Sequence, residues 1–74
     1  MKPVAVESTT LSAVTYDSGH QVLEVEFCDQ SVYQYFGVPA EVHGALMIAA
    51  SKGSYFNRNI RGRFVYVRLS NPPN

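Results

Sequence analysis

The chain has 74 residues and a mass of 8.2 kDa, so we expect one small domain. Hydrophobic residues make up 46 % of the sequence and charged residues 16 %, a balance that favours a folded core over disorder. No apolar run approaches the roughly 18 residues of a membrane helix, and no signal-peptide pattern opens the chain. Because Cys28 is the only cysteine, an internal disulfide is excluded. We therefore expect a cytoplasmic protein that makes no contact with a membrane.

The net charge of zero hides an asymmetry along the chain. Residues 1–51 hold all six acidic side chains and one lysine, giving −5, whereas residues 52–74 hold five basic side chains, giving +5. Such a split is typical either of a basic binding surface or of two halves that neutralise each other in the fold. In the second case Arg63 and Arg68 would pair with Glu24 or Glu26 across a sheet. Charge alone slightly favours neutralisation.

Three β-strands are predicted in the first half of the chain. Residues 11–17 are rich in β-formers and end in the turn sequence Asp17-Ser18-Gly19. Residues 21–27 alternate, and residues 31–36 form a third strand rich in aromatics. The alternation places Leu23, Val25 and Phe27 on one face and Glu24 and Glu26 on the other. Short turns between the strands predict an antiparallel meander.

The length of the loop between the second and third strands decides the position of two tyrosines. A two-residue turn, Asp29-Gln30, places Tyr33 and Tyr35 on the solvated face beside the glutamates. A three-residue loop with Gln30 at positive φ moves the register by one residue and turns both rings toward the core. The sequence leaves both alternatives open.

A helix is predicted after the third strand, with Pro39 at its first position. Val42, Ala45, Leu46 and Ala49 recur at helical spacing. Gly53 is suited to end this helix, and Gly44 suggests close packing on the sheet.

A short second helix is predicted over residues 55–60, with Ser54 as its N-cap. Residues 63–69 read as a final strand.

These elements predict an α+β fold with two layers: a small antiparallel sheet in β-β-β-α-β order, one main helix on one face, and room for a short second helix. We expect a flexible lead-in over residues 1–8, a single domain over residues 9–69 and a flexible tail over residues 70–74. The expected core comprises Leu23, Val25, Phe27, Val42, Leu46, Ala49 and Phe56.

Residues 52–68 interleave cations, amides and aromatic rings, a pattern compatible with RNA binding. The candidate binding residues are Lys52, Arg58, Arg61, Arg63, Arg68, Tyr55 and Tyr66. On the solvated sheet face, Glu24 and Glu26 lack the dry pocket that catalytic carboxylates need. His20, His43 and Cys28 have no metal-ligand spacing and are expected on the surface or inert. No nucleotide or nucleophile motif is present, so we expect no enzyme, no cofactor and no metal.

Several short motifs in a fixed order resemble the KTSC domain family. They are Tyr16-Asp17, Leu23-x-Val25-x-Phe27, Tyr33-x-Tyr35 before Val38-Pro39, Ala50-Ser51-Lys52-Gly53-Ser54-Tyr55-Phe56-Asn57 running to Ile60-Arg61, and Phe64-x-Tyr66-x-Arg68. The sequence departs from the family at Gln30, where members often carry glycine. The family occurs at the C-terminus of some lysyl-tRNA synthetases and as stand-alone bacterial proteins.

The resemblance implies a small bacterial or phage-borne binding domain with RNA or tRNA as its partner. From the residues, the alternative is a protein-interaction module that uses an open sheet edge to pair with a partner strand or a second copy.

Overall fold

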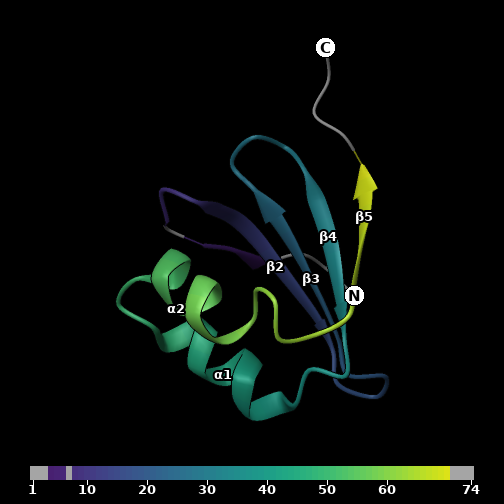
Figure 1. Cartoon of the computed structure of the whole chain (residues 1–74). Helices are drawn as coiled ribbons and strands as arrows, with labels where there is room; N and C mark the ends of the chain where they lie inside the picture. Colours follow the sequence, from purple (N-terminus) through teal and green to yellow (C-terminus); the bar gives the residue numbers. More distant parts are fainter. Residues whose placement is uncertain (1–3, 7, 71–74) are drawn as a thin grey trace.

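The computed structural model of the chain describes residues 4–6 and 8–70. Its strands form one antiparallel sheet in the order β1-β2-β3-β4-β5, and both helices lie on one face of this sheet (Figure 1). The elements in chain order are β1 (Val4–Ala5), β2 (Leu11–Asp17), β3 (Val22–Phe27), β4 (Val32–Phe36), α1 (Ala40–Ile48), α2 (Lys52–Asn59) and β5 (Tyr66–Ser70). The α+β class with two layers is confirmed.

The expected β-β-β-α-β order is wrong, because four strands precede the helices. The additional strand, β1, falls within residues 1–8 and pairs Val4 with Val14 and Ala5 with Ala13 of β2. Two residues are too few to show an alternating pattern in the sequence, which explains why β1 was not predicted. The last strand begins at Tyr66 and not at Arg63. Residues 71–74, in the predicted tail, lie outside the described residues.

The loop between β3 and β4 has three residues, so the second register alternative is the one observed. Gln30 adopts a φ of 74°, and the Phe27 N–H donates to the Ser31 carbonyl oxygen at 2.9 Å. Tyr33 therefore pairs with Val25, and Tyr35 pairs with Leu23. Both tyrosines join the helix-covered face of the sheet.

The boundary between the helices differs from the prediction in a way that lengthens α2. Pro39 is the N-cap of α1 and not its first residue, and Ala49 is the C-cap. Ser51 caps α2, because its hydroxyl accepts the Ser54 N–H at 3.3 Å. Gly53 therefore lies inside α2 and does not end α1. A Cβ atom at Gly44 would have open space for 4 Å around it, so Gly44 does not mark close packing on the sheet.

The core lies between the sheet and the two helices. Four of the expected core residues, Leu23, Val25, Leu46 and Phe56, are fully buried, and Phe27 and Val42 pack against them. Ala49 is only partly buried. The other buried hydrophobic residues are Leu11, Val14, Tyr35, Val38 and Ile60.

Phe56 packs α2 against the sheet. Its ring makes edge-to-face contacts with Phe27 and Tyr35, at centroid distances of 5.4 and 5.3 Å. Figure 1 shows β5 at the edge of the sheet remote from the helices, so this part of the sheet has no helix over it. Within residues 4–6 and 8–70, no helix has the length and apolar character needed to cross a membrane.

Candidate functional site

A groove of about 670 Å³ opens between α2 and the part of the sheet formed by β4 and β5. Its volume falls in the range of about 300–1,000 Å³ that is usual for ligand sites. We call it the tyrosine groove; the lining residues that matter for its chemistry are Phe27, Tyr33, Tyr35, Asn57, Arg61 and Tyr66.

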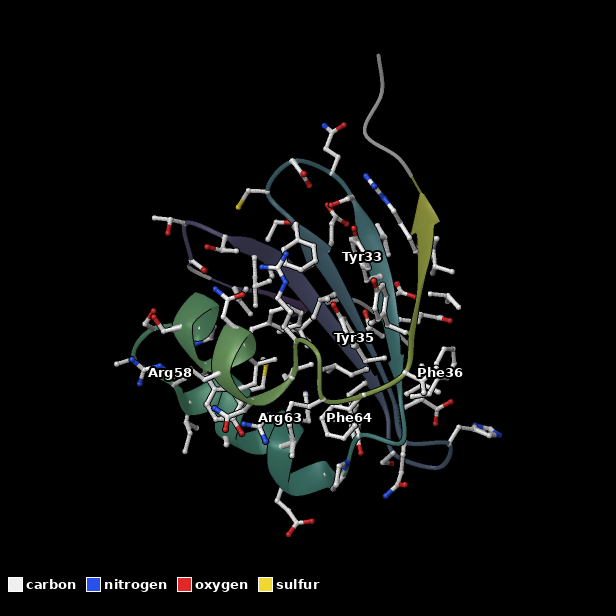
Figure 2. The ribbon with its side chains drawn as sticks, viewed as in Figure 1. Tyr33, Tyr35, Phe36, Arg58, Arg63 and Phe64 are labelled. Carbon is white, nitrogen blue, oxygen red and sulfur yellow. The ribbon has the colours of Figure 1, made fainter. Side chains whose placement is uncertain are left out.

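Three tyrosine rings form the sheet side of the tyrosine groove. Tyr35 pairs with Tyr66 across β4 and β5, and Tyr33 lies two residues before Tyr35 on the same face. The centroid of Tyr66 lies 5.8 Å from that of Tyr33 and 5.5 Å from that of Tyr35. Figure 2 shows Tyr33 and Tyr35 on the helix side of β4, with Phe36 on the other side. Tyr35 is 4 % exposed and Tyr66 54 %, so Tyr66 offers the most accessible ring.

α2 and the turn that follows it supply an amide and a guanidinium to the same groove. The backbone N–H of Arg61 donates to the Phe56 carbonyl oxygen at 2.9 Å, and Gly62, at a φ of 75°, then turns the chain away from the helix. The Arg61 Nη1 donates to the Asn57 Oδ1 at 3.4 Å. The fold thus holds a cation and an amide opposite the tyrosine rings.

Asp29 is the carboxylate that lines the tyrosine groove. Its Oδ1 accepts hydrogen bonds from the Ser31 hydroxyl at 2.5 Å and from the Ser31 N–H at 3.0 Å. These bonds, together with the positive charge of Arg68, lower the pKa of Asp29, so it is ionised at neutral pH. Its negative charge disfavours the binding of an anionic group at this end of the groove.

The Tyr35 hydroxyl remains neutral at physiological pH. Burial raises the pKa of Tyr35, and the neighbouring Tyr33 acts in the same direction. Arg61 has the opposite, smaller effect. Tyr35 can therefore act as a neutral hydrogen-bonding group beside the guanidinium.

The structure divides the seven candidate binding residues among several places. Arg61 and Tyr66 line the tyrosine groove, and the guanidinium carbon of Arg68 lies 5.6 Å from the centroid of the Tyr33 ring. Arg58 and Arg63 are exposed on the other side of α2 from Tyr33 (Figure 2). The remaining two are held by other contacts, since the Lys52 Nζ donates to the Ala49 carbonyl oxygen at 3.2 Å and Tyr55 packs against the core.

Four of the five basic residues in the second half of the chain do not pair closely with the acidic half. Among the described residues, Lys52, Arg58, Arg61 and Arg63 form no ion pair with a carboxylate, and the ion pair that is present joins His20 to Asp17 at 2.9 Å. The expected pairing of Arg63 with Glu24 or Glu26 is therefore wrong. Arg68 lies on the helix-covered face beside Tyr33, whereas the two glutamates lie on the opposite face.

The histidines and the cysteine are separate from the tyrosine groove's aromatic wall. His43 is half-buried and stacks on Tyr16, with 4.5 Å between ring centroids, and burial lowers the pKa of His43. His20 is exposed, as expected, whereas the expected surface position of His43 is wrong, because it packs against Tyr16. Cys28 is exposed and lines the groove. In the part of the chain that the structure describes, no three His, Cys, Asp or Glu side chains come together as a metal site.

Sequence reasoning missed Tyr33, Tyr35 and Asn57 as groove residues. The signal for the tyrosines was present in the three-residue loop alternative, which turned both rings toward the helices. Asn57 gave no such signal, because its position depends on where α2 begins and how it crosses the sheet.

Known proteins resemble this chain in both sequence and fold. Residues 7–64 match the KTSC domain. An uncharacterised protein of Stutzerimonas stutzeri is 47 % identical over 58 residues, which is 78 % of this chain and 82 % of that protein. The lysine–tRNA ligase of Trichormus variabilis is 44 % identical over 64 residues, covering 86 % of this chain but 11 % of the ligase.

A crystal structure of a KTSC domain protein from Yersinia pestis has the same fold. It superposes with a TM-score of 0.90 at 35 % identity, covering 93 % of this chain and 97 % of that one. The sequence match over most of the chain and the shared fold lead to one conclusion: this chain belongs to the KTSC domain family.

Proposed function

We propose that this chain is a non-enzymatic domain that binds single-stranded RNA, in particular unpaired segments of tRNA, through the tyrosine groove and the cations around α2. The observation that carries the proposal is that Arg61 and Asn57 line the same groove as Tyr33 and Tyr66. An exposed ring can stack on an unpaired base, and a nearby guanidinium can bind the adjoining phosphate. An amide in reach of both can hydrogen-bond to a base edge.

The distribution of charge favours a polyanion on the helix side of the sheet. Arg58, Arg61 and Arg63 are exposed and, among the described residues, have no carboxylate partner. Glu24 faces the opposite side, where the Gln34 Nε2 donates to it at 3.1 Å. An RNA chain lying along α2 and the tyrosine groove would meet the cations and avoid the glutamates.

The relatives supply an independent reason to choose RNA. Lysine–tRNA ligases act on tRNA, and a segment of three of them is 41–44 % identical to 86 % of this chain. The segment is a small part of each ligase, since the chain spans 11 % of their length. A domain that holds an unpaired stretch of tRNA would serve both in such ligases and alone. We propose that the protein acts in the bacterial cytoplasm.

Fluorescence anisotropy with a labelled single-stranded RNA of mixed sequence tests the proposal. Replacing Tyr66 by Ala removes the most accessible ring and should raise the Kd about 5- to 150-fold, because stacking contributes about 1–3 kcal/mol per base. Tyr66→Phe keeps the ring and should bind like the wild type. Ile48→Ala, which truncates an exposed apolar side chain on α1, is the matched control.

Two results would contradict this function. One is unchanged affinity in Tyr66→Ala, which would remove base stacking from the account. The other is a fully paired RNA duplex that binds as tightly as the single strand, since a duplex has no free base for the tyrosine groove.

A further inference from the structure

The strand β5 forms an open edge of the sheet and carries large apolar side chains. In the described part of the chain it pairs with β4 alone. Val65, just before the strand, is 75 % exposed, and Val67 and Leu69 within it are 43 and 51 % exposed. Natural edge strands are usually protected from pairing by charges, prolines or bulges. β5 carries Arg68 and a register shift between Arg68 and Ser70, whereas residues 65–67 have neither a charge nor a bulge and include two exposed valines.

The backbone of β5 presents hydrogen-bonding groups along this edge. The Phe36 N–H donates to the Val65 carbonyl oxygen at 2.9 Å, which makes Phe36 and Val65 a hydrogen-bonded pair. Because such pairs alternate along antiparallel strands, the next one joins Gln34 and Val67. The backbone N–H and C=O groups of Tyr66 and Arg68 consequently point away from β4, in the direction that a further strand would occupy.

We propose that β5 pairs with β5 of a second copy of this chain, antiparallel and centred on Val67, to form a continuous sheet across two copies. This register aligns the outward backbone groups of Tyr66 with those of Arg68 of the second copy. It also places Val67 against Val67 of the second copy. The inference is independent of the proposed RNA binding.

Charge and side-chain type favour this register over the one centred on Arg68. A pairing centred one residue later would set Arg68 directly against Arg68 of the second copy, and like charges in that position are destabilising. The Val67-centred pairing sets Arg68 against an aromatic ring instead, the same type of neighbour that it has in Tyr33 within the chain. The strand is therefore complementary to itself.

The rest of the fold leaves room for the second copy. Figure 1 shows both helices well away from the sheet edge that β5 forms, so neither would obstruct a strand at that edge. The two-fold axis passes between the two Val67 residues, perpendicular to the sheet, so both helix layers lie on the same face. The two tyrosine grooves would then open side by side, each next to the shared strands.

Sedimentation equilibrium of the full chain, over a range of concentrations, tests the pairing with two substitutions at its centre. The wild type should approach about 16 kDa, twice the 8.2 kDa of the chain. Val67→Lys and Val67→Glu should each remain monomeric, because each sets like charges against each other. An equimolar mixture of the two variants should recover the dimer mass, because lysine then faces glutamate.

Val4→Lys is the matched control, since Val4 lies on the opposite edge strand and is 52 % exposed. It should dimerise like the wild type, and circular dichroism should show all variants folded. A wild type that is monomeric up to about 1 mM overturns the proposal, as does a Val67→Lys variant that remains dimeric. Loss of the dimer in Val4→Lys would indicate a head-to-tail contact between β1 and β5, and it too would overturn it.

Discussion

Gly53, in the first turn of α2, packs directly against the side chain of Thr10, just before β2. A Cβ atom at Gly53 would lie 2.9 Å from the Thr10 Oγ1 and 3.2 Å from the Thr10 Cβ. This close approach fixes the start of α2 against the sheet. One turn later Asn57 lines the tyrosine groove, so the contact helps to set the position of a groove residue.

Adding a methyl group at Gly53 should destabilise the domain, whereas the same change at Gly44 should stabilise it. Gly44 lies within α1 with open space around it, so Gly44→Ala should raise the free energy of unfolding by up to about 1 kcal/mol. For Gly53→Ala, an overpacking cost of about 1–3 kcal/mol exceeds that gain. Urea unfolding of both variants measures the difference, and equal stabilisation by the two would contradict the Gly53–Thr10 contact.

Truncation of Leu46 should remove much of the stability of the domain. The side chain is fully buried between α1 and the sheet, so Leu46→Ala should cost about 2–5 kcal/mol, against a total of roughly 5–15 kcal/mol for a typical domain. Ile48→Ala, two residues later on the same helix and 85 % exposed, should change stability by less than about 0.5 kcal/mol. If thermal unfolding gave the same melting temperature for the two variants, the assignment of Leu46 to the buried face of α1 would be wrong.

The half-buried His43 should make the domain less stable in mild acid. Burial lowers its pKa below the usual 6.5, so the folded state binds fewer protons than the unfolded chain. Its contribution is complete above pH 6.5 and is lost as the pH falls toward the lower folded pKa. The lowered pKa values of Asp17 and Asp29 act below pH 3.8 and leave this window clear.

We therefore expect His43→Phe, which keeps a ring against Tyr16, to flatten the decline of unfolding free energy between about pH 7 and pH 5. Urea unfolding at several pH values in this range measures it. Parallel profiles for the variant and the wild type would show that His43 does not cause the decline.

Removing two arginines should weaken RNA binding across sequences and reduce its dependence on salt. Each lost phosphate contact on a single strand lowers the slope of log K against log salt by about 0.7. Arg58→Ala with Arg61→Ala should therefore flatten the slope by about one unit or more. Stability should change by roughly 0–1 kcal/mol per arginine, because both side chains are exposed.

The control for this experiment is Glu26→Gln, which changes a charge on the opposite sheet face and should leave the slope unchanged. A double arginine variant with the slope of the wild type would place the phosphate contacts elsewhere.

The sequence was most informative where a single residue pattern predicts a single element. The alternation of Leu23, Val25 and Phe27 predicted β3 and its buried face, and the helical spacing around Leu46 predicted the packing of α1. The register of β4 depends on the conformation of Gln30. The φ of Gln30 is set by the interactions of the whole β3–β4 hairpin and not by this residue alone. The sequence could therefore state the alternatives for Tyr33 and Tyr35 and not choose between them.

The tyrosine groove could not be predicted from the sequence, because it forms where elements that are distant in the sequence meet. Asn57 comes from α2, Arg61 from the turn that follows it, Tyr33 from β4 and Tyr66 from β5. The sequence predicted that Gly53 ends the first helix and that Ser54 caps the second. In the structure α2 begins earlier, with Ser51 as its N-cap.

The central claim is that unpaired RNA binds in the tyrosine groove, and an NMR titration with single-stranded RNA tests it most directly. The account predicts that amide shifts concentrate at Asn57, Arg61 and Tyr66 and on the adjoining part of β4. Glu24 and Glu26, on the other face of the sheet, should hardly shift. Shifts centred on the glutamate face, or none at a saturating RNA concentration, would contradict it.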